Sequence, residues 1–222
     1  VSDDIFHLES LPKSILIVGG GYIACEFACI LHGLGVEVTQ YYRGAQILRG
    51  FDDEARGLIA EAMRTRGIDV HTGTNIVSMQ LASETDMGSG PTGSDATMGA
   101  DVSHQTELMQ ATAEAADPSR GGPIRVKSTN GSERVFDAVL FATGRRPNTA
   151  DMGLEEIGVT LGRGGEIAVD DHSKSDVDNI YAIGDITNRV NLTPVAIREG
   201  MAFVETVFKD NPTPVDHDLI PS

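Results

Sequence analysis

The chain of 222 residues has few cysteines, no tryptophan and little positive charge. Its two cysteines are too few for a disulfide-stapled fold, and such low usage favours a reducing compartment, the cytoplasm. No apolar run approaches the ~20 residues that a membrane helix needs. We expect no signal peptide, because the first twelve residues mix acidic and apolar side chains.

The scarcity of positive charge narrows the possible partners. Lysine and arginine together number 17 against 33 acidic residues, so the formal net charge is −16 at pH 7. Such an acidic chain repels nucleic acids and anionic membrane surfaces, so neither is expected as a partner. The six histidines have neither metal-ligand nor triad spacing, and no metal site is predicted.

The N-terminal part of the chain alternates between strand and helix patterns. Buried strands are predicted at residues 15–18 and 36–42, with a glycine turn at residues 19–21 after the first. The helix between them is expected to bury one apolar face: Ile23, Phe27, Ile30, Leu31 and Leu34. Asp52 is the expected N-cap of a second helix. Its predicted apolar stripe comprises Ala55, Leu58, Ile59, Ala62 and Met63. This order predicts an α/β, Rossmann-like fold with a parallel sheet and right-handed crossovers.

The middle of the chain has the two-residue alternation of half-exposed strands. Three antiparallel strands are predicted at residues 77–81, 124–126 and 134–136, the last two joined by an Asn-Gly turn at residues 130–131. A buried strand resumes at residues 138–142. We therefore expect a three-stranded meander inserted into the α/β unit.

The C-terminal part has a third pattern. Short strands are predicted at residues 167–169 and 179–183. A closing helix is predicted at residues 192–208, because Pro194 suits the first turn of a helix.

A long acidic segment interrupts the meander. Residues 82–122 hold seven acidic residues, one arginine and no aromatic residue, which is too little apolar surface to offset the entropy of ordering. We predict a disordered insertion there, with a frayed helix at residues 104–116. The expected domains are a nucleotide-binding domain at residues 1–147, which contains this insertion, and a second domain at residues 148–222.

The glycine turn belongs to the pattern Gly19-x-Gly21-x-x-Ala24 between a predicted strand and a predicted helix. Gly19 permits the tight turn, Gly21 lets a pyrophosphate approach the backbone, and Ala24 lets the helix pack close to the strand. The free N–H groups and the dipole at the start of the helix then face the phosphates. This context predicts a dinucleotide site, and a glycine-rich turn without a ligand is the alternative.

The end of the second predicted strand bears on which dinucleotide binds. NAD sites usually carry an acidic residue there to hold a ribose hydroxyl. This chain has Gln40 near the strand end, followed by Arg43 and Arg49. Two arginines can hold the 2′-phosphate of NADPH by charge-assisted hydrogen bonds, so NADPH is favoured. The alternative is that both arginines are solvated charges ahead of an acidic helix start.

Two further turns each follow a short apolar strand: Ala-Thr-Gly-Arg at residues 142–145 and Tyr-Ala-Ile-Gly-Asp at residues 181–185. Taken in order with the glycine turn, the arginine pair and Leu-Thr-Pro-Val-Ala at residues 192–196, they resemble the flavin disulfide reductases, which are pyridine nucleotide-disulfide oxidoreductases. The resemblance covers nearly the whole chain except residues 82–122, and it is greatest to the bacterial-type glutathione-disulfide reductases. The chain is similar to an internal fragment of such an enzyme.

The resemblance implies two cofactor sites. NADPH would be contacted by Gly19, Gly21, Tyr22, Ile23, Ala24, Arg43, Arg49, Gly144 and Arg145. Among these, Tyr22 would cover the nicotinamide pocket. FAD would be contacted by Gly184, Asp185, Leu192 and Thr193, in a site of which only half is present in the chain. Glu26 matches a glutamate that forms an ion pair beside the flavin, and a solvated helix charge is the alternative.

The chain departs from the family at its cysteines. The family reduces its substrate through a Cys-x4-Cys pair, whereas Cys25 and Cys29 are spaced Cys-x3-Cys inside the first predicted helix. We expect both to be small buried residues on one helix face. The first flavin motif and the interface domain of the family, whose full-length members are homodimers, are also absent. NADPH binding without turnover is therefore expected of this chain alone.

The implied function is reduction of glutathione disulfide by NADPH, with the hydride passing through FAD and a redox disulfide. Flavin disulfide reductases of the trypanothione, mercuric or lipoamide type stay open as alternatives, because the residues that contact substrate would lie mostly outside this stretch. A non-catalytic nucleotide-binding remnant is the alternative from a different functional class.

Overall fold

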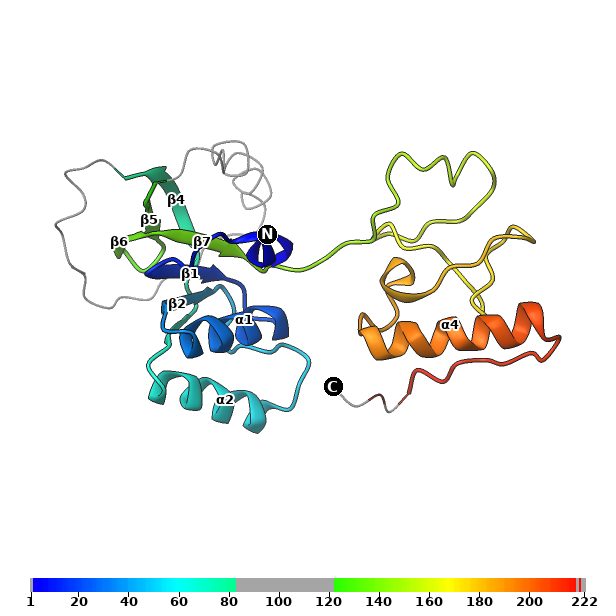
Figure 1. Ribbon diagram of the computed structural model, residues 1–222, viewed down its shortest axis with the longest axis horizontal. Coiled ribbons are helices and arrows are strands. Elements are labelled where there is room, and N and C mark those ends of the chain that lie inside the picture. Colours follow the sequence, from blue (N-terminus) through cyan, green and yellow to red (C-terminus); the bar gives the residue numbers. More distant parts are fainter. Residues whose placement is uncertain (1, 83–121, 219, 221–222) are drawn as a thin grey trace. The chain divides into compact units, whose positions relative to one another are not determined.

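The computed structural model describes residues 2–82, 122–218 and 220. It divides into two compact units, Val1–Gly144 (unit 1) and Arg145–Ser222 (unit 2) (Figure 1). Most of the predicted insertion at residues 82–122, including its predicted frayed helix, lies outside the described residues.

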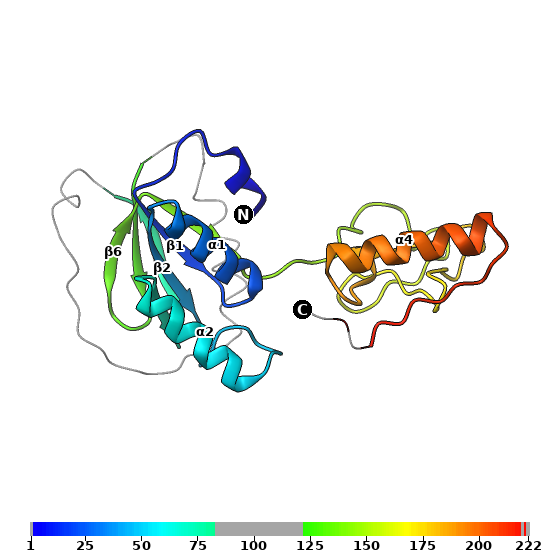
Figure 2. The same cartoon turned by 60° about the horizontal axis from the view of Figure 1, so that its bottom comes forward.

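Unit 1 is built on a four-stranded parallel sheet with the strand order β3-β2-β1-β7. Its strands are β1 (Ser14–Val18), β2 (Glu37–Tyr42), β3 (Asp69–Thr72) and β7 (Ala138–Phe141). Helices α1 (Tyr22–Gly33) and α2 (Asp53–Thr65) lie side by side on one face of the sheet (Figure 2). The predicted parallel α/β fold is confirmed.

A three-stranded antiparallel sheet covers the other face of the parallel sheet. Its order is β4-β5-β6, with β4 (Ile76–Leu81), β5 (Ile124–Ser128) and β6 (Glu133–Phe136). Side chains alternate along β1: Ile15 and Ile17 pack with the helices, whereas Leu16 and Val18 pack with Val126 and Phe136 of the meander. This two-sided burial is why β1 is a bare apolar run in the sequence.

The buried faces of both helices match the predicted apolar faces only in part, at Leu31 and Met63. Helix α1 buries Ala24, Cys25, Ala28 and Leu31, and α2 buries Ala60 and Met63. The predicted positions Leu34 and Leu58 are instead 59% and 69% exposed. Small residues face the sheet because they permit a close approach of helix to strand, and the apolar periodicity alone does not reveal this rotation.

Asp52 caps α2 as predicted, since its side chain accepts hydrogen bonds from the backbone N–H groups of Glu54 and Ala55 at 3.1 and 3.0 Å. The chain also begins with a short 3-10 helix, η1 (Ser2–His7). None of the described helices is both long and apolar enough to span a membrane.

Unit 2 is held together mainly by turns and one long helix. Helix α4 (Thr193–Phe208) begins after Leu192 with a proline in its first turn, as predicted. A 3-10 turn, η3 (Gly184–Thr187), packs against α4. A small core forms around Val159, Ile167 and Ala182.

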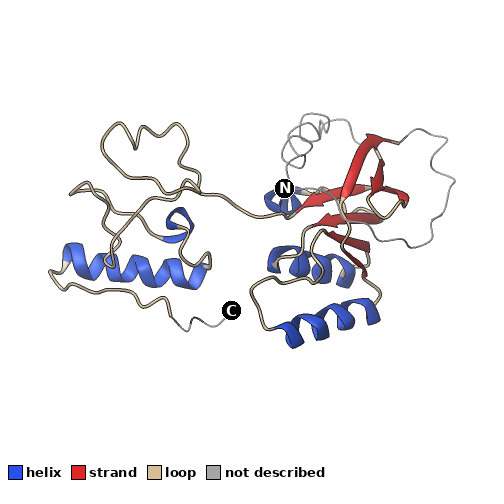
Figure 3. Ribbon diagram, turned by 180° about the vertical axis from the view of Figure 1, so that it is seen from behind, coloured by secondary structure: helices blue, strands red, loops and turns tan. Residues whose placement is uncertain are grey.

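The two strands predicted in unit 2 are wrong. Figure 3 shows this unit as helices and loops. Within residues 145–218, the β pairing consists of isolated bridges, Leu161 with Ile167 and Lys174 with Tyr181. Few backbone hydrogen bonds hold these segments: Ala182 N–H donates to the Ser173 carbonyl at 2.9 Å as part of the Lys174–Tyr181 bridge, and Ile167 N–H donates to the Ile186 carbonyl of η3 at 3.0 Å. Apolar alternation over so few residues predicts burial but not a ladder partner.

Candidate functional site

The glycine turn after β1 has a conformation that only glycine tolerates at its first position. Gly19 has φ +144°, and a Cβ atom there would collide with the carbonyl oxygen of Ala142. The same hypothetical Cβ would lie 3.4 Å from the Cβ of Ala24. Strand β1, strand β7 and helix α1 therefore meet at Gly19 with no room for a side chain.

Gly21 and the start of α1 form an open, positively polarised surface. Gly21 is the N-cap of α1 and supplies no side-chain cap, so the N–H groups of the first helical turn point outward. A Cβ atom at Gly21 would meet no atom of the described residues within 4 Å. Tyr22, the first helical residue, is 37% exposed, and Ile23 is half-buried. An anionic group can reach this helix end directly.

The carboxyl ends of three parallel strands meet at this turn. Gly19 N–H donates to the Tyr41 carbonyl at the end of β2 at 2.9 Å, and Ala142 N–H donates to the Val18 carbonyl at 2.8 Å. Gly144 follows two residues after Ala142 with φ +128°, and a Cβ there would meet no described atom within 4 Å. Two motifs that are far apart in the sequence thus share one edge of the sheet. Arg145 is the first residue of unit 2.

The loop after β2 folds back onto the glycine turn. Leu48 has φ +56°, and its N–H donates to the Gly20 carbonyl at 2.5 Å. This bond brings the neighbouring Arg49 to the same strand edge, where its side chain is exposed. Arg43, directly after β2, is exposed as well. Both predicted phosphate-binding arginines therefore belong to one loop, residues 43–49 (the arginine loop). The Leu48–Gly20 hydrogen bond holds this loop against the predicted pyrophosphate site.

Residues that the sequence analysis missed shape this loop. The guanidinium of Arg56 on α2 donates to the Ile47 carbonyl at 2.7 Å and to the Gln46 carbonyl at 3.1 Å. The ring of Tyr42 occupies the space next to both Gly20 and Gly44, since a Cβ at either glycine would collide with it. No sequence motif identifies either residue, because each acts on the backbone of this loop through the folded geometry and not through a fixed spacing.

Behind the turn lies a buried amide. The side chain of Gln40 is fully buried, and its Nε2 donates to the Gly19 carbonyl at 2.9 Å and to Cys25 Sγ at 3.6 Å. Burial raises the pKa of the Cys25 thiol and outweighs the opposing hydrogen bond from Gln40, so the thiol stays neutral at pH 7. Cys25 is buried as expected.

The prediction for Cys29 is wrong, because its side chain is exposed. One helical turn separates the cysteines, but α1 rests on the sheet along Ala24, Cys25 and Ala28. Position 29 therefore lies at the solvent side. Glu26, one turn after Tyr22, is also exposed.

The predicted flavin-side residues gather around η3 and the start of α4 in unit 2. Gly184 has φ +70°, and a Cβ there would lie 3.1 Å from the Cβ of Ala196 on α4. Asp185 follows with an exposed side chain. Leu192 is the N-cap of α4 and Thr193 its first residue.

A buried carboxylate lies beneath this turn, and the sequence analysis did not single it out. Glu199 of α4 is 1% exposed, and its Oε2 accepts a hydrogen bond from Gly184 N–H at 2.5 Å. Its Oε1 lies 2.8 Å from Arg189 Nη2 and 2.7 Å from His217 Nε2. The available signal was spacing, since Glu199 shares the face of α4 that buries Val195 and Ala202.

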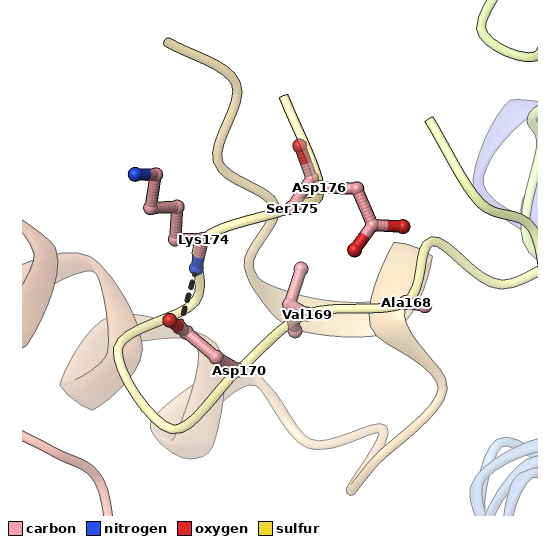
Figure 4. Close-up of a pocket in the computed structure, with 6 residues that line it drawn as sticks. All are labelled: Ala168, Val169, Asp170, Lys174, Ser175 and Asp176. Carbon is pink, nitrogen blue, oxygen red and sulfur yellow. Dashed lines mark hydrogen bonds between the residues drawn. The ribbon is translucent and has the colours of Figure 1, made fainter. Parts of the chain in front are cut away.

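Unit 2 also has an open depression of about 380 Å³ (Figure 4). Its lining residues are Ala168, Val169, Asp170, Lys174, Ser175 and Asp176. Asp170 Oδ1 accepts hydrogen bonds from the backbone N–H groups of His172 and Lys174, both at 2.9 Å. The carboxylate is thus satisfied by its own turn, and none of the predicted site residues lines this depression.

Comparison with known proteins connects these turns to one family. Two family models with the same description, pyridine nucleotide-disulphide oxidoreductase, match residues 14–90 and residues 96–200. The chain belongs to the pyridine nucleotide-disulphide oxidoreductases. Members of this oxidoreductase family use FAD and NAD(P)H. The family model that matches residues 14–90 begins at β1 and includes the glycine turn and the arginine loop.

Curated relatives agree over nearly the whole chain. It is 40% identical to glutathione reductase of Burkholderia cepacia over 99% of the chain and 40% of the relative. It is 42% identical to the chloroplastic/mitochondrial glutathione reductase of Pisum sativum, over 100% of the chain and 33% of the relative. Trypanothione reductase of Leishmania donovani is 39% identical over 99% of the chain and 38% of that protein. The chain therefore spans well under half the length of these relatives.

Solved structures agree on the fold. The HOCl-induced flavoprotein disulfide reductase RclA of Escherichia coli matches with a TM-score of 0.72 at 22% identity, over 95% of this chain and 39% of that one. LpdA of Mycobacterium tuberculosis matches with a TM-score of 0.72 at 23% identity, over 98% of this chain and 39% of that one.

Proposed function

We propose that the chain is part of an NADPH-dependent glutathione-disulfide reductase, in which residues 1–147 bind NADPH and residues 148–222 contribute to a flavin domain. The observation that carries this proposal is that α1 begins at Gly21 without a side-chain cap and with open space in front of its first N–H groups. The hydrogen bond from Leu48 N–H to the Gly20 carbonyl keeps the neighbouring Arg49 close to this helix start. The names and identities of the curated relatives support the substrate.

The residues around the glycine turn fit the phosphates of a dinucleotide. Gly19 and Ala24 keep side chains out of the junction, and Gly21 leaves the helix N–H groups open for a pyrophosphate. Ile23 contributes the second of those N–H groups. Arg43 and Arg49 would bind a 2′-phosphate by charge-assisted hydrogen bonds.

The remaining residues of the proposed NADPH site are assigned by resemblance. Tyr22 would cover the nicotinamide, and its exposure at the first position of α1 suits that role. Gly144 and Arg145 would line the part of the site that holds the adenosine of NADPH. The open space at Gly144 suits a close approach of that ligand.

In unit 2, the flavin assignment is supported by the turn at Gly184. The positive φ of Gly184 and its packing against α4 leave the Asp185 carboxylate exposed, where it could accept a hydrogen bond from a ribityl hydroxyl. Leu192 and Thr193 at the start of α4 would lie against the flavin. Glu26 in unit 1 would form the flavin-side ion pair. The chemistry that the two cofactors supply when bound is hydride transfer from the nicotinamide to the flavin and onward to a disulfide.

The test is a titration of the 222-residue chain with NADPH and, separately, with NADH, followed by the fluorescence of the reduced nicotinamide. We expect saturable binding of NADPH and at least tenfold weaker binding of NADH. Equal affinities would remove the 2′-phosphate assignment, and the absence of binding would remove the dinucleotide site. A parallel assay with NADPH and glutathione disulfide should show no steady turnover by the chain alone.

The two free cysteines favour a reducing compartment and support a cytoplasmic enzyme, and the family resemblance supports a homodimer as the complete assembly. Reduction of trypanothione disulfide is the second candidate function, since the Leishmania donovani relative is 39% identical. A comparison of the two disulfides as substrates of the complete enzyme distinguishes the candidates.

A further inference from the structure

The buried carboxylate of Glu199 needs a physical explanation. A charged side chain that is 1% exposed is costly unless it is paired and hydrogen-bonded. An apolar residue at this position of α4 would continue the face that Val195 and Ala202 already bury. The structure instead places a carboxylate there and surrounds it with donors.

Three donors from two different segments converge on Glu199. Its Oε2 accepts from Gly184 N–H of η3 at 2.5 Å. Its Oε1 is 2.8 Å from Arg189 Nη2, just after η3, and 2.7 Å from His217 Nε2 in the C-terminal segment. The carboxylate therefore joins α4 to the proposed flavin turn and to residues beyond the helix.

The other side of the Gly184 peptide is also held. Thr187 Oγ1 donates to the Gly184 carbonyl at 2.8 Å, and Arg189 Nε donates in turn to Thr187 Oγ1 at 3.3 Å. Arg189 Nη2 also donates to Ser173 Oγ at 3.0 Å. Because both polar groups of Gly184 are fixed, the direction in which the chain leaves toward Asp185 is fixed too.

We propose that Glu199 is a positioning residue for the flavin site: its carboxylate holds the Gly184 peptide so that Asp185 projects outward, while Arg189 balances its charge and His217 donates to it. This inference rests on the proposed role of Gly184 and Asp185 toward FAD. It assigns Glu199 no contact with the cofactor.

The deciding measurement is amide hydrogen exchange at Gly184, followed by NMR of the 222-residue chain. The main variant replaces Arg189 and Glu199 together by methionine, which removes the acceptor without leaving an uncompensated buried charge. Glu199→Gln is the second variant, because it keeps the shape of the side chain but offers one acceptor oxygen in place of two. Arg198→Met, at an exposed neighbouring position on α4, is the matched control.

We expect Gly184 exchange to accelerate at least about tenfold in the double variant and several-fold in Glu199→Gln. A titration with FAD, monitored by flavin fluorescence, should give an apparent Kd that rises about tenfold in the double variant while its melting temperature stays close to that of the wild type. Arg198→Met should change neither quantity more than twofold.

Gly184 exchange within twofold of the wild type in the folded variants would overturn the inference. Faster exchange with an unchanged affinity for FAD would overturn the role toward the flavin. If the unaltered chain binds no FAD, the role of Glu199 toward the flavin is overturned for this chain alone, since only half of the site is present, and Gly184 exchange still decides whether Glu199 holds the turn.

Discussion

The two units keep their candidate cofactor turns in place by different means. In unit 1, the glycine turn follows a central strand of a parallel sheet, and Gly19 and Gly20 are held mainly by backbone groups of Tyr41 and Leu48, with one further hydrogen bond from the Gln40 side chain. In unit 2, η3 is held by the side chains of Glu199 and Thr187, within residues whose β pairing is limited to isolated bridges. A site held by backbone hydrogen bonds tolerates side-chain changes around it, whereas a site held by one buried carboxylate depends on that residue.

The largest expected effect tests unit 2. Glu199→Ala should lower the free energy of unfolding of unit 2 by about 3–5 kcal/mol, because it leaves the Arg189 guanidinium, whose side chain is 22% exposed, without its partner. Urea unfolding followed by NMR should show the signals of unit 2 disappearing before those of unit 1. Arg198→Ala is the control, and a loss of less than about 1 kcal/mol for Glu199→Ala would contradict the comparison between units.

The next effect concerns the turn of unit 1. Gly19→Ala should abolish NADPH binding and cost about 1–3 kcal/mol of stability, because the new Cβ meets the Ala142 carbonyl and φ is +144°. Gly35→Ala is the matched control, since Gly35 also has positive φ (+89°) but a Cβ there meets no described atom within 4 Å. NADPH titration and urea unfolding give both quantities. Normal NADPH affinity in Gly19→Ala would exclude the turn as the binding site.

A smaller effect is expected on the affinity for NADPH alone, without a change in the stability of the protein. Arg49→Gln should weaken NADPH binding by about 1.5 kcal/mol, roughly tenfold, and leave NADH binding unchanged, because only the contact with the 2′-phosphate is lost. Its thermal stability should not change, since Arg49 is exposed. Arg66→Gln, at the exposed C-cap of α2, is the control. Parallel losses for both nucleotides would argue that Arg49 acts on the pyrophosphate instead.

The smallest effect is a pH dependence in unit 1. The hydrogen bonds from His71 and then Arg134 lower the pKa of Asp69 from 3.8 to about 2, against the opposing effect of burial. Because the folded pKa is depressed, the stabilisation is fully present above about pH 3.8 and is lost as the pH falls toward 2. Asp69→Asn should therefore lower the free energy of unfolding by less than about 1 kcal/mol at pH 7, since the side chain is 48% exposed, and by only a small part of that near pH 2.

Urea unfolding at several pH values checks this expectation. Asp178→Asn in unit 2 is the control, because its carboxylate is fully exposed in an ion pair with Lys174 and should contribute nothing measurable. An Asp69→Asn effect that persists undiminished near pH 2 would show that the loss comes from packing rather than from charge.

Much of unit 1 could be predicted from the sequence because its signals are local. Residues 15–18 are apolar on both sides, glycines follow directly, and Asp52 precedes its helix at the capping position. The helix rotations could not be predicted, because periodicity identifies an apolar face but not which residues are small enough to approach the sheet. Cys29 was misplaced for the same reason.

Unit 2 was harder to predict because its order depends on contacts between distant positions. The alternation near residues 167–169 and 179–183 correctly indicates burial at Ile167 and Ala182, yet each segment pairs through a single bridge. Glu199 and His217 are 18 positions apart, and no motif connects them. Residue types alone therefore did not suggest the cluster.

By resemblance, the motifs indicated the family; by itself, the sequence determined the alternation of strands and helices in unit 1 and the positions where glycine is required. These features follow from short-range sterics and from residue spacing, which act within a few positions of one another. Only the tertiary structure decided that Leu48 N–H donates to the Gly20 carbonyl, which positions the arginine loop, and that the Glu199 carboxylate accepts from Gly184 N–H. Hydrogen bonds between distant segments form only after the chain has folded, because packing must first exclude water from both partners.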